Sequence, residues 1–216
     1  MGKAIVVTLG FEEKFLARCM MRVHGGGGLS RVVLFVPSPS DDYSSRRSEE
    51  AFRALKKLAE EYMGAAVERV VVDPADFWGC VSRARSLIMS ILDSGVEKVF
   101  LCIASGMRAL VAALIVAALT LPRDYDLERV VVQGDLESGT GMVEFAVSQV
   151  RSLAELTSTE ERVLKLLSEV GELRLSDVAR RLELPKSTVW RTLVSLERKG
   201  LVEKLPQGLY RAKVRL

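Results

Sequence analysis

Residues 99–119, VFLCIASGMRALVAALIVAAL, decide the fold of this chain. The run from Val99 to Ala104 is continuously apolar and rich in branched side chains, which predicts a buried parallel strand. Ser105-Gly106-Met107-Arg108 then forms a small-residue turn, and the Ala/Leu-rich run that follows consists of good helix formers. A strand, a glycine turn and a helix in this order direct free backbone N–H groups at an anion just beyond the carboxyl end of the strand.

Arg108 falls in the first turn of the expected helix, where its planar guanidinium group suits a phosphate. A plain strand-to-helix turn, with Arg108 in solvent, is the other interpretation of the same residues. The segments before and after this stretch therefore decide between the two.

Strands and helices alternate along the first part of the chain. Hydrophobic periodicity and turn residues predict strands at 4–9, 31–36, 67–72, 98–103, 129–132 and 142–145, with helices at 12–23, 46–62, 75–94 and 109–119. Such repeated units predict the α/β class, as a Rossmann-like, doubly wound, mainly parallel sheet with right-handed crossovers. The last two strands would form a hairpin that gives the sheet an antiparallel edge.

Ligands of doubly wound sheets bind outside the carboxyl ends of the strands, near the point where the strand order reverses. The first turn lacks Gly-x-Gly-x-x-Gly, which argues against a dinucleotide cofactor, and the chain has no Gly-x-x-x-x-Gly-Lys-Ser/Thr for an NTPase. Three turns can meet at this edge, and they supply the candidate ligand-binding residues Thr8, Leu9, Gly10, Phe11, Pro37, Ser38, Ser105, Gly106, Met107 and Arg108. Two of these have an alternative role: Thr8 can cap a turn, and Phe11 can pack against its own helix.

Charge divides the chain into two parts. Residues 157–216 hold 13 Lys and Arg against 8 Asp and Glu, whereas residues 1–156 hold 18 against 20. The net charge is therefore +5 for residues 157–216 and −2 for residues 1–156, which indicates that only the C-terminal segment meets a polyanion. We expect a ligand-sensing domain at 1–147, a linker at 148–156 and a DNA-binding domain at 157–216.

Cysteine usage and hydropathy are typical of a cytoplasmic protein with no membrane partner. Cys19, Cys80 and Cys102 are scattered and lack metal-ligand spacing, so we expect reduced, buried side chains and no metal site. His24, the only histidine, has no evident base partner, and no catalytic residue is expected. The most apolar run ends at Pro122, too short for a bilayer of ~30 Å, and the first strand begins too close to the start for a signal peptide.

The basic segment predicts three short helices and a hairpin. The third helix begins after Pro185, buries Val189, Leu193 and Leu196, and leaves polar side chains facing outward in its first turns. In a major groove, Lys or Arg meets guanine edges, and Ser or Thr meets bases or phosphate. The hairpin returns with one basic and one apolar face, although domains of this shape also serve as protein-docking modules. The candidate DNA-binding residues are Lys186, Ser187, Thr188, Trp190, Arg191, Arg211 and Lys213.

The run LPKSTVWRTL at 184–193, followed by LERKGLV at 196–202, resembles the winged helix–turn–helix of prokaryotic transcription regulators. Thr8-Leu9-Gly10-Phe11 ends the first expected strand, and Ser105-Gly106-Met107-Arg108 follows a later one. With these motifs in this order, the whole chain resembles the archaeal CRISPR-associated regulators that join a Rossmann-like CARF sensor to a winged helix.

This resemblance implies a homodimer whose paired sensors form one two-fold site for a cyclic oligoadenylate, typically cyclic tetraadenylate. Residues 8–11 would form one wall of the site, and residues 105–108 would hold phosphates and ribose. Met107 stands where many relatives have a second glycine, a departure that bears on the choice of nucleotide. An isologous interface presents each turn twice, which suits a symmetric ring.

The expected function is therefore a transcription regulator of antiviral defence that binds double-stranded DNA and takes cyclic tetraadenylate as a regulatory ligand, with no cofactor. Two other functions stay open. One is a ring nuclease, in which Ser105 and Arg108 assist attack of a ribose 2′-hydroxyl on its phosphate. The other is a docking protein whose C-terminal segment binds another protein.

Overall fold

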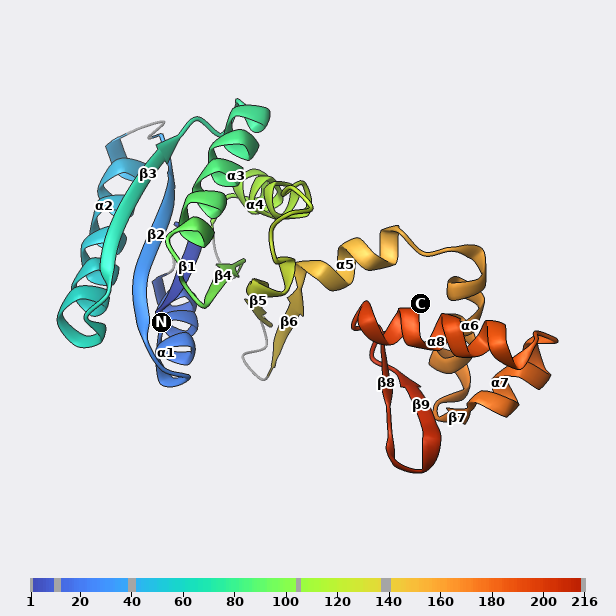
Figure 1. Ribbon diagram of the computed structural model, residues 1–216. Helices are drawn as coiled ribbons and strands as arrows, with labels where there is room; N and C mark the ends of the chain where they lie inside the picture. Colours follow the sequence, from blue (N-terminus) through green and yellow to red (C-terminus); the bar gives the residue numbers. More distant parts are fainter. Residues whose placement is uncertain (1, 10–12, 39–41, 104–105, 137–140, 215–216) are drawn as a thin grey trace. The chain divides into compact units, whose positions relative to one another are not determined.

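The computed structural model describes residues 2–9, 13–38, 42–103, 106–136 and 141–214. The chain divides into two compact units, residues 1–147 and 148–216. Each unit has its own core and is described by itself (Figure 1).

The N-terminal unit is built on a six-stranded sheet with the strand order β3-β2-β1-β4-β5-β6. The first five strands are parallel, and β6 runs antiparallel to β5 as the last edge strand. The prediction of a doubly wound, mainly parallel sheet with an antiparallel hairpin is confirmed. The strands are β1 (Lys3–Thr8), β2 (Leu29–Pro37), β3 (Ala66–Val72), β4 (Lys98–Cys102), β5 (Val130–Asp135) and β6 (Met142–Ala146).

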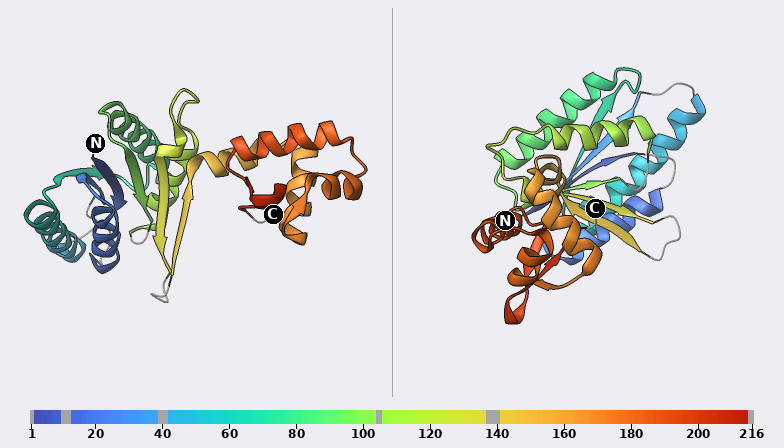
Figure 2. Two further views of the ribbon diagram at one scale, coloured as in Figure 1. Left: turned by 60° about the horizontal axis from the view of Figure 1, so that its bottom comes forward. Right: turned by 90° about the vertical axis from the view of Figure 1, so that its right-hand side faces the viewer.

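Two helical layers cover the sheet (Figures 1 and 2). Side chains alternate between the faces of a strand, so in β4 Val99 and Leu101 pack toward α3 and α4, whereas Phe100 and Cys102 pack toward α1 and α2. Both faces are buried, which explains the continuous apolar runs of the central strands. The helices are α1 (Glu13–Gly25), α2 (Asp42–Lys57), α3 (Phe77–Asp93) and α4 (Arg108–Leu119); a π-helical turn, Leu58–Tyr62, extends α2, and a 3-10 turn, Leu127–Arg129, precedes β5.

Two of the three cysteines are paired. Cys19 of α1 and Cys102 at the end of β4 form a disulfide, with a Cα–Cα distance of 6.7 Å, and Cys80 is free and buried. The expectation of three reduced cysteines is therefore wrong for this pair. The two lie 83 residues apart in the chain and meet only because β4 turns Cys102 toward the α1 layer. In Cys80, burial raises the pKa of the thiol, with Asp76 and Asp73 adding to the effect.

The C-terminal unit packs its helices and a small antiparallel sheet around one core. The predicted core residues Val189, Leu193 and Leu196 are fully buried. The segment 148–156, expected as a linker, groups with this unit; it contains most of α5, and Leu153 and Leu156 pack against the core. The elements are α5 (Val147–Ala154), α6 (Ser158–Val170), β7 (Leu173–Arg174), α7 (Leu175–Leu182), α8 (Lys186–Arg198), β8 (Val202–Lys204), a 3-10 turn (Pro206–Gly208) and β9 (Leu209–Ala212), with strand order β7-β9-β8.

The most apolar run of the sequence, which is predicted to be too short for a bilayer, contains most of α4. Among the described residues, no helix has both the length and the apolar character needed to cross a bilayer. Helix α4 has 12 residues and lies within the core of the N-terminal unit.

Candidate ligand site and DNA interface

The strand order reverses between β1 and β4. β1 lies between β2 and β4, and the helices that follow β1 and β4 cover opposite faces of the sheet. The connections therefore diverge at the carboxyl ends of these two strands, and ligand crevices of doubly wound sheets form at such a point. Two of the three predicted turns meet here: the turn that begins at Thr8 and the turn that ends at Arg108.

Gly106 and Thr8 are in direct contact at this point. A Cβ atom at position 106 would lie 2.4 Å from Thr8 Oγ1 and 2.7 Å from Thr8 Cβ, so no larger residue fits without movement. Gly106 also has a φ of +108°, which L side chains rarely adopt. Space and backbone conformation both require glycine here. Thr8 is fully buried, so its hydroxyl contacts the turn from the interior of the unit.

The turn delivers the N-terminus of α4 to the edge of the sheet. Met107 is the extended N-cap residue, and as far as the described residues show, no side chain caps this helix end. The amides of Leu110 and Val111 bond to the Met107 carbonyl, whereas Arg108 begins the helix with an exposed side chain. The Met107 side chain is 48 % exposed. A positive helix end, a guanidinium group and an apolar side chain thus lie together, which suits a phosphate next to a base.

The other predicted ligand residues lie in different surroundings. Leu9 is buried in the α1–α2 core, and its N–H donates to the Phe35 carbonyl at 2.7 Å. Pro37 is half-buried at the end of β2; Ser38 is exposed, and its N–H donates to the Val72 carbonyl at 2.7 Å. Three of the predicted residues, Gly10, Phe11 and Ser105, lie outside the described residues.

Sequence reasoning missed a polar cluster at the end of β5. Asp135 pairs with Arg22 of α1, and the side chain of Gln133 donates to Glu144 of β6. Asp135 is 7 % exposed in its side chain, and its Oδ2 has no hydrogen-bond partner among the residues that the structure describes. The signal in the sequence is a glutamine and an aspartate at the end of an otherwise apolar strand. Since β5 runs parallel to β4 beside it, this cluster lies at the same edge of the sheet as the end of β4.

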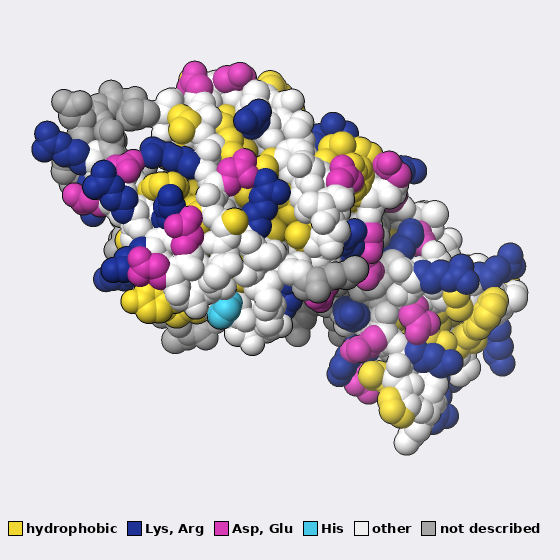
Figure 3. Space-filling view, turned by 60° about the vertical axis from the view of Figure 1, so that its left-hand side comes forward, with side chains coloured by type: hydrophobic (Ala, Val, Ile, Leu, Met, Phe, Trp, Pro, Cys, Tyr) yellow, Lys and Arg dark blue, Asp and Glu magenta, His cyan; other side chains and the backbone are white. Residues whose placement is uncertain are grey.

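The first turns of α8 present the predicted DNA-contacting side chains. Lys186, Ser187 and Arg191 are exposed, Trp190 is 55 % exposed, and Thr188 is half-buried. The opposite face of α8 supplies the core of the unit, which fixes the direction of these side chains. In Figure 3, dark blue Lys and Arg side chains lie on the C-terminal unit, with magenta Asp and Glu side chains among them. A large exposed apolar side chain within a basic surface is typical of a binding face.

Of the two remaining candidates, Arg211 lies in β9 and Lys213 follows the end of β9, and they differ in charge environment. Arg211 forms ion pairs with Glu203 at 2.7 Å and with Glu172 at 3.3 Å. The hydrogen bond and charge of Glu203, with those of Glu172, raise the pKa of Arg211. Lys213 is exposed, and no ion pair of it is found in the described part of the chain. Arg211 therefore offers a phosphate less net charge than its position suggests.

Comparison with known protein families identifies the N-terminal unit. Residues 3–146 match the model of the Csa3 CRISPR-associated Rossmann-like domain. The chain belongs to the Csa3 family. Residues 162–206 of this Csa3 family chain match a second model, the IclR helix-turn-helix domain. The two matches together pair a CRISPR-associated Rossmann-like domain with a helix-turn-helix domain in one chain.

Solved structures also match the chain. Csm6 of Enterococcus italicus, bound to cyclic hexa-2′-fluoro-hexa-dAMP, is 13 % identical with a TM-score of 0.53; the match covers 91 % of the Csa3 family chain and 55 % of Csm6. Can2 of Sulfobacillus thermosulfidooxidans, in complex with cyclic tetra-adenylate, is 8 % identical with a TM-score of 0.44. That match covers 98 % of the Csa3 family chain and 59 % of Can2. The likeness to Csm6 shows the fold alone, and this chain spans little more than half the length of either structure. No curated protein matches the chain in sequence.

Proposed function

We propose that this chain is a CRISPR-associated transcriptional regulator that binds double-stranded DNA through α8 and the β8–β9 hairpin and is controlled by a cyclic oligoadenylate. Cyclic tetraadenylate is the ring that we expect. The observation that carries the proposal is the contact of Gly106 with Thr8, which places the Arg108 end of α4 at the reversal of strand order. Membership of the Csa3 family supports it, as do the cyclic oligoadenylates bound to Csm6 and Can2.

Each part of the turn has a proposed role toward the ligand. The N–H groups at the start of α4 and the Arg108 guanidinium bind a phosphate by charge-assisted hydrogen bonds. Met107 offers an apolar surface to an adenine ring. Thr8 and Leu9, which are buried, position the turn instead of lining the site. Gly10, Phe11, Pro37, Ser38 and Ser105 stay in the proposal as ligand-binding residues.

A homodimer is part of the proposal. A cyclic tetranucleotide of identical units has rotational symmetry, and two copies joined by an isologous interface present the Gly106 turn twice to it. Two copies also present two α8 helices, so the DNA site would consist of half-sites about one helical turn, ~34 Å, apart. The ligand alters DNA binding only if it favours one arrangement of the two sensors over the other.

Calorimetry tests the proposed ligand. The full chain should bind cyclic tetraadenylate at one ring per two chains and should bind AMP much more weakly. Equal affinity for the two nucleotides, or a strictly monomeric chain during sedimentation with the ring present, would show that the sensor assignment is wrong. The recovered ligand also tests the ring-nuclease alternative: linear product that disappears in Ser105→Ala and Arg108→Ala would make the chain an enzyme.

A further inference from the structure

A buried carboxylate begins α6. Glu160 is only 5 % exposed and forms a capping box with Thr157. Glu160 Oε2 accepts hydrogen bonds from the Thr157 N–H at 2.8 Å and the Thr157 hydroxyl at 3.0 Å, and the Glu160 N–H donates to Thr157 Oγ1 at 3.3 Å. A capping box satisfies the free amides of a helix start and works at the surface. Burial of its glutamate therefore needs a further explanation.

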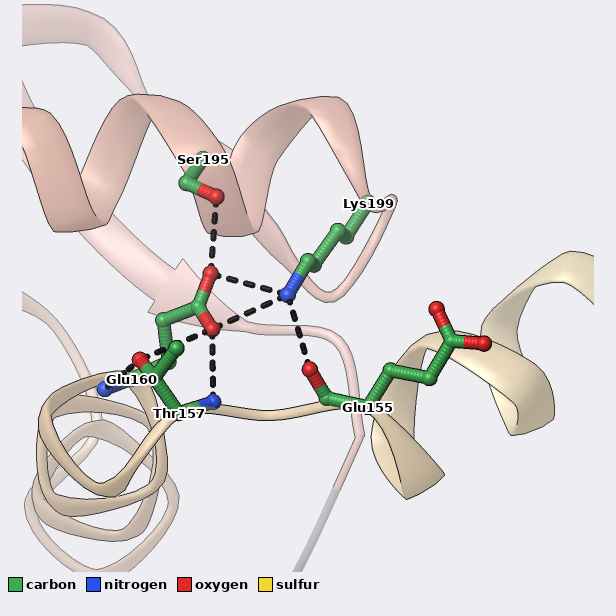
Figure 4. Close-up of polar contacts among 5 residues, drawn as sticks. All are labelled: Glu155, Thr157, Glu160, Ser195 and Lys199. Atoms are coloured by element: carbon green, nitrogen blue, oxygen red, sulfur yellow. Dashed lines mark hydrogen bonds and ion pairs between the residues drawn. The ribbon is translucent and has the colours of Figure 1, made fainter.

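Two side chains at the C-terminal end of α8, the proposed recognition helix, contact the same carboxylate. Ser195 donates to Glu160 Oε1 at 2.7 Å, and Lys199 Nζ, just beyond the end of α8, lies 2.9 Å from the carboxylate (Figure 4). A buried charge is tolerated only when it is paired and hydrogen-bonded. Glu160 meets this condition entirely with groups from its own cap and from α8. The start of α6 is thus fastened to the C-terminal end of the recognition helix.

Lys199 extends the cluster to α5. Its Nζ also donates to the carbonyl of Glu155, which follows α5, at 3.4 Å (Figure 4). Leu153 and Leu156 pack into the core of the unit, and a Cβ at Gly200 would touch Gln149 Cγ at 4.0 Å. The end of α5 is therefore held against the C-terminal end of α8, and Gln149 lies close to Gly200.

At its other end, α5 continues directly from the sheet of the N-terminal unit. β6 ends at Ala146, and the next residue, Val147, begins α5 and is buried in the core beneath α3 and α4. No loop separates the edge strand of the sheet from the helix that is fastened to α8. Along the chain, α5 is therefore the segment that joins the sheet of the N-terminal unit to the C-terminal unit.

We propose that Glu160 and Lys199 are positioning residues that fix α5 to the recognition helix, so that the ligand state of the sensor reaches DNA through this cluster. The inference rests on the proposed function, because it assigns the path between its two sites. Neither residue is assigned a contact with ligand or with DNA. Loss of the cluster should separate the two binding events and leave each of them in place.

Lys199→Met in the full chain tests the path. The readout is the ratio of duplex affinities with and without saturating cyclic tetraadenylate, measured by fluorescence anisotropy on a duplex selected from a random library. In the wild type this ratio should be about fivefold or more. In Lys199→Met it should fall to within about twofold of unity, while ligand affinity by calorimetry stays within about twofold of the wild-type value. Lys199→Arg, which keeps the charge, should restore the ratio.

Lys165→Met is the matched control, because it removes one exposed lysine of α6 outside the cluster and should keep the wild-type ratio. Ser195→Ala, a milder change, replaces Lys199→Met if that variant fails to fold. A wild-type ratio in both cluster variants would overturn the proposal.

Hydrogen exchange of the ligand-free chain separates this inference from the proposed function. Amides of residues 148–154 should exchange about tenfold faster or more in Lys199→Met, with those of α7 unchanged. If the wild type itself shows no ligand effect on DNA binding, ligand control is refuted, and exchange alone decides whether the cluster positions α5. Unchanged exchange would then refute the positioning role.

Discussion

Gly106 lies against Thr8 so closely that a Cβ on Gly106 would be 2.4 Å from the Thr8 hydroxyl oxygen. The contact joins the end of β1 to the turn that starts α4, across the reversal of strand order. The position of Met107 and Arg108 at the edge of the sheet therefore depends on the absence of a side chain at Gly106.

Gly106→Ala should therefore disrupt ligand binding. The new methyl group must push the turn away from Thr8, and alanine is strained at a φ of +108°. We expect a destabilisation of about 1–3 kcal/mol and a loss of about tenfold or more in cyclic tetraadenylate affinity by calorimetry. Gly95→Ala is the control, because Gly95 also has a positive φ (+79°) but has open space around it. The Gly95→Ala protein should lose stability and keep its affinity for cyclic tetraadenylate. A Gly106→Ala protein that binds the ring normally would show that this turn is not the ligand site.

Arg108→Lys tests how the phosphate is held. Lysine keeps the positive charge and loses the planar pair of donors that a phosphate accepts. We expect a loss of about tenfold in ligand affinity by calorimetry, corresponding to ~1.4 kcal/mol, and no change in duplex affinity without ligand. Arg83→Lys, an exposed arginine of α3, serves as the matched change. Equal ligand affinity of Arg108→Lys and wild type would mean that Arg108 faces solvent.

The salt dependence of DNA binding should distinguish the basic residues of the C-terminal unit. Each phosphate contact that is removed reduces the slope of log K against log salt by about 1. Lys186→Ala and Lys213→Ala should each produce such a reduction. Arg211→Ala should produce a smaller one, because Glu203 and Glu172 already balance the charge of Arg211. If Arg211→Ala gives the largest change, its acidic partners release it when DNA binds.

Trp190 should contribute to DNA affinity without contributing to the salt dependence. Trp190 is 55 % exposed and is not among the residues of the C-terminal core. Trp190→Ala should lower duplex affinity by about tenfold, with an unchanged salt slope and an unchanged thermal midpoint. A fall in the midpoint with unchanged affinity would indicate that Trp190 packs on its own hairpin.

Acid should weaken the C-terminal unit through Glu160. Burial alone would raise the pKa of this carboxyl, but hydrogen bonds from the Thr157 backbone, Lys199, Ser195 and the Thr157 hydroxyl outweigh it and lower the pKa to about 2. Since the folded pKa lies below the ordinary value of 4.5, the ionised group stabilises the fold above pH 4.5, and this stability is lost as the pH falls toward 2.

Urea unfolding of wild type and Glu160→Gln measures this contribution. The difference in free energy of unfolding should be of order 2–3 kcal/mol at pH 7 and should shrink at pH 3. Glu169→Gln, an exposed glutamate of the same helix, should differ little from wild type at either pH. A difference that is independent of pH would mean that the glutamine variant loses packing and not charge.

The features that could be predicted are those set by local patterns. Continuous apolar runs separated by helical periods specify a parallel sheet, and the glycine turn after β4 marks the reversal edge. The apolar positions Val189, Leu193 and Leu196 orient α8 and so expose Lys186 and Trp190. These patterns depend on neighbours in the chain.

Pairings between distant segments could not be predicted. Cys19 meets Cys102 only after the sheet has formed, and Arg22 meets Asp135 in the same way. Helix α6 begins at Ser158 with Thr157 as its capping residue, and Glu160, the partner of Thr157 in the capping box, is buried by α8. A glutamate in a helix start is ordinarily exposed, so its burial has no signal in the sequence of α6.

The most direct test of ligand control is the affinity of the full chain for a selected duplex in three samples: without nucleotide, with AMP and with cyclic tetraadenylate. Fluorescence anisotropy should give a dissociation constant that changes by about fivefold or more, in one direction, only with cyclic tetraadenylate. The same dissociation constant in all three samples would contradict control of DNA binding by the ring.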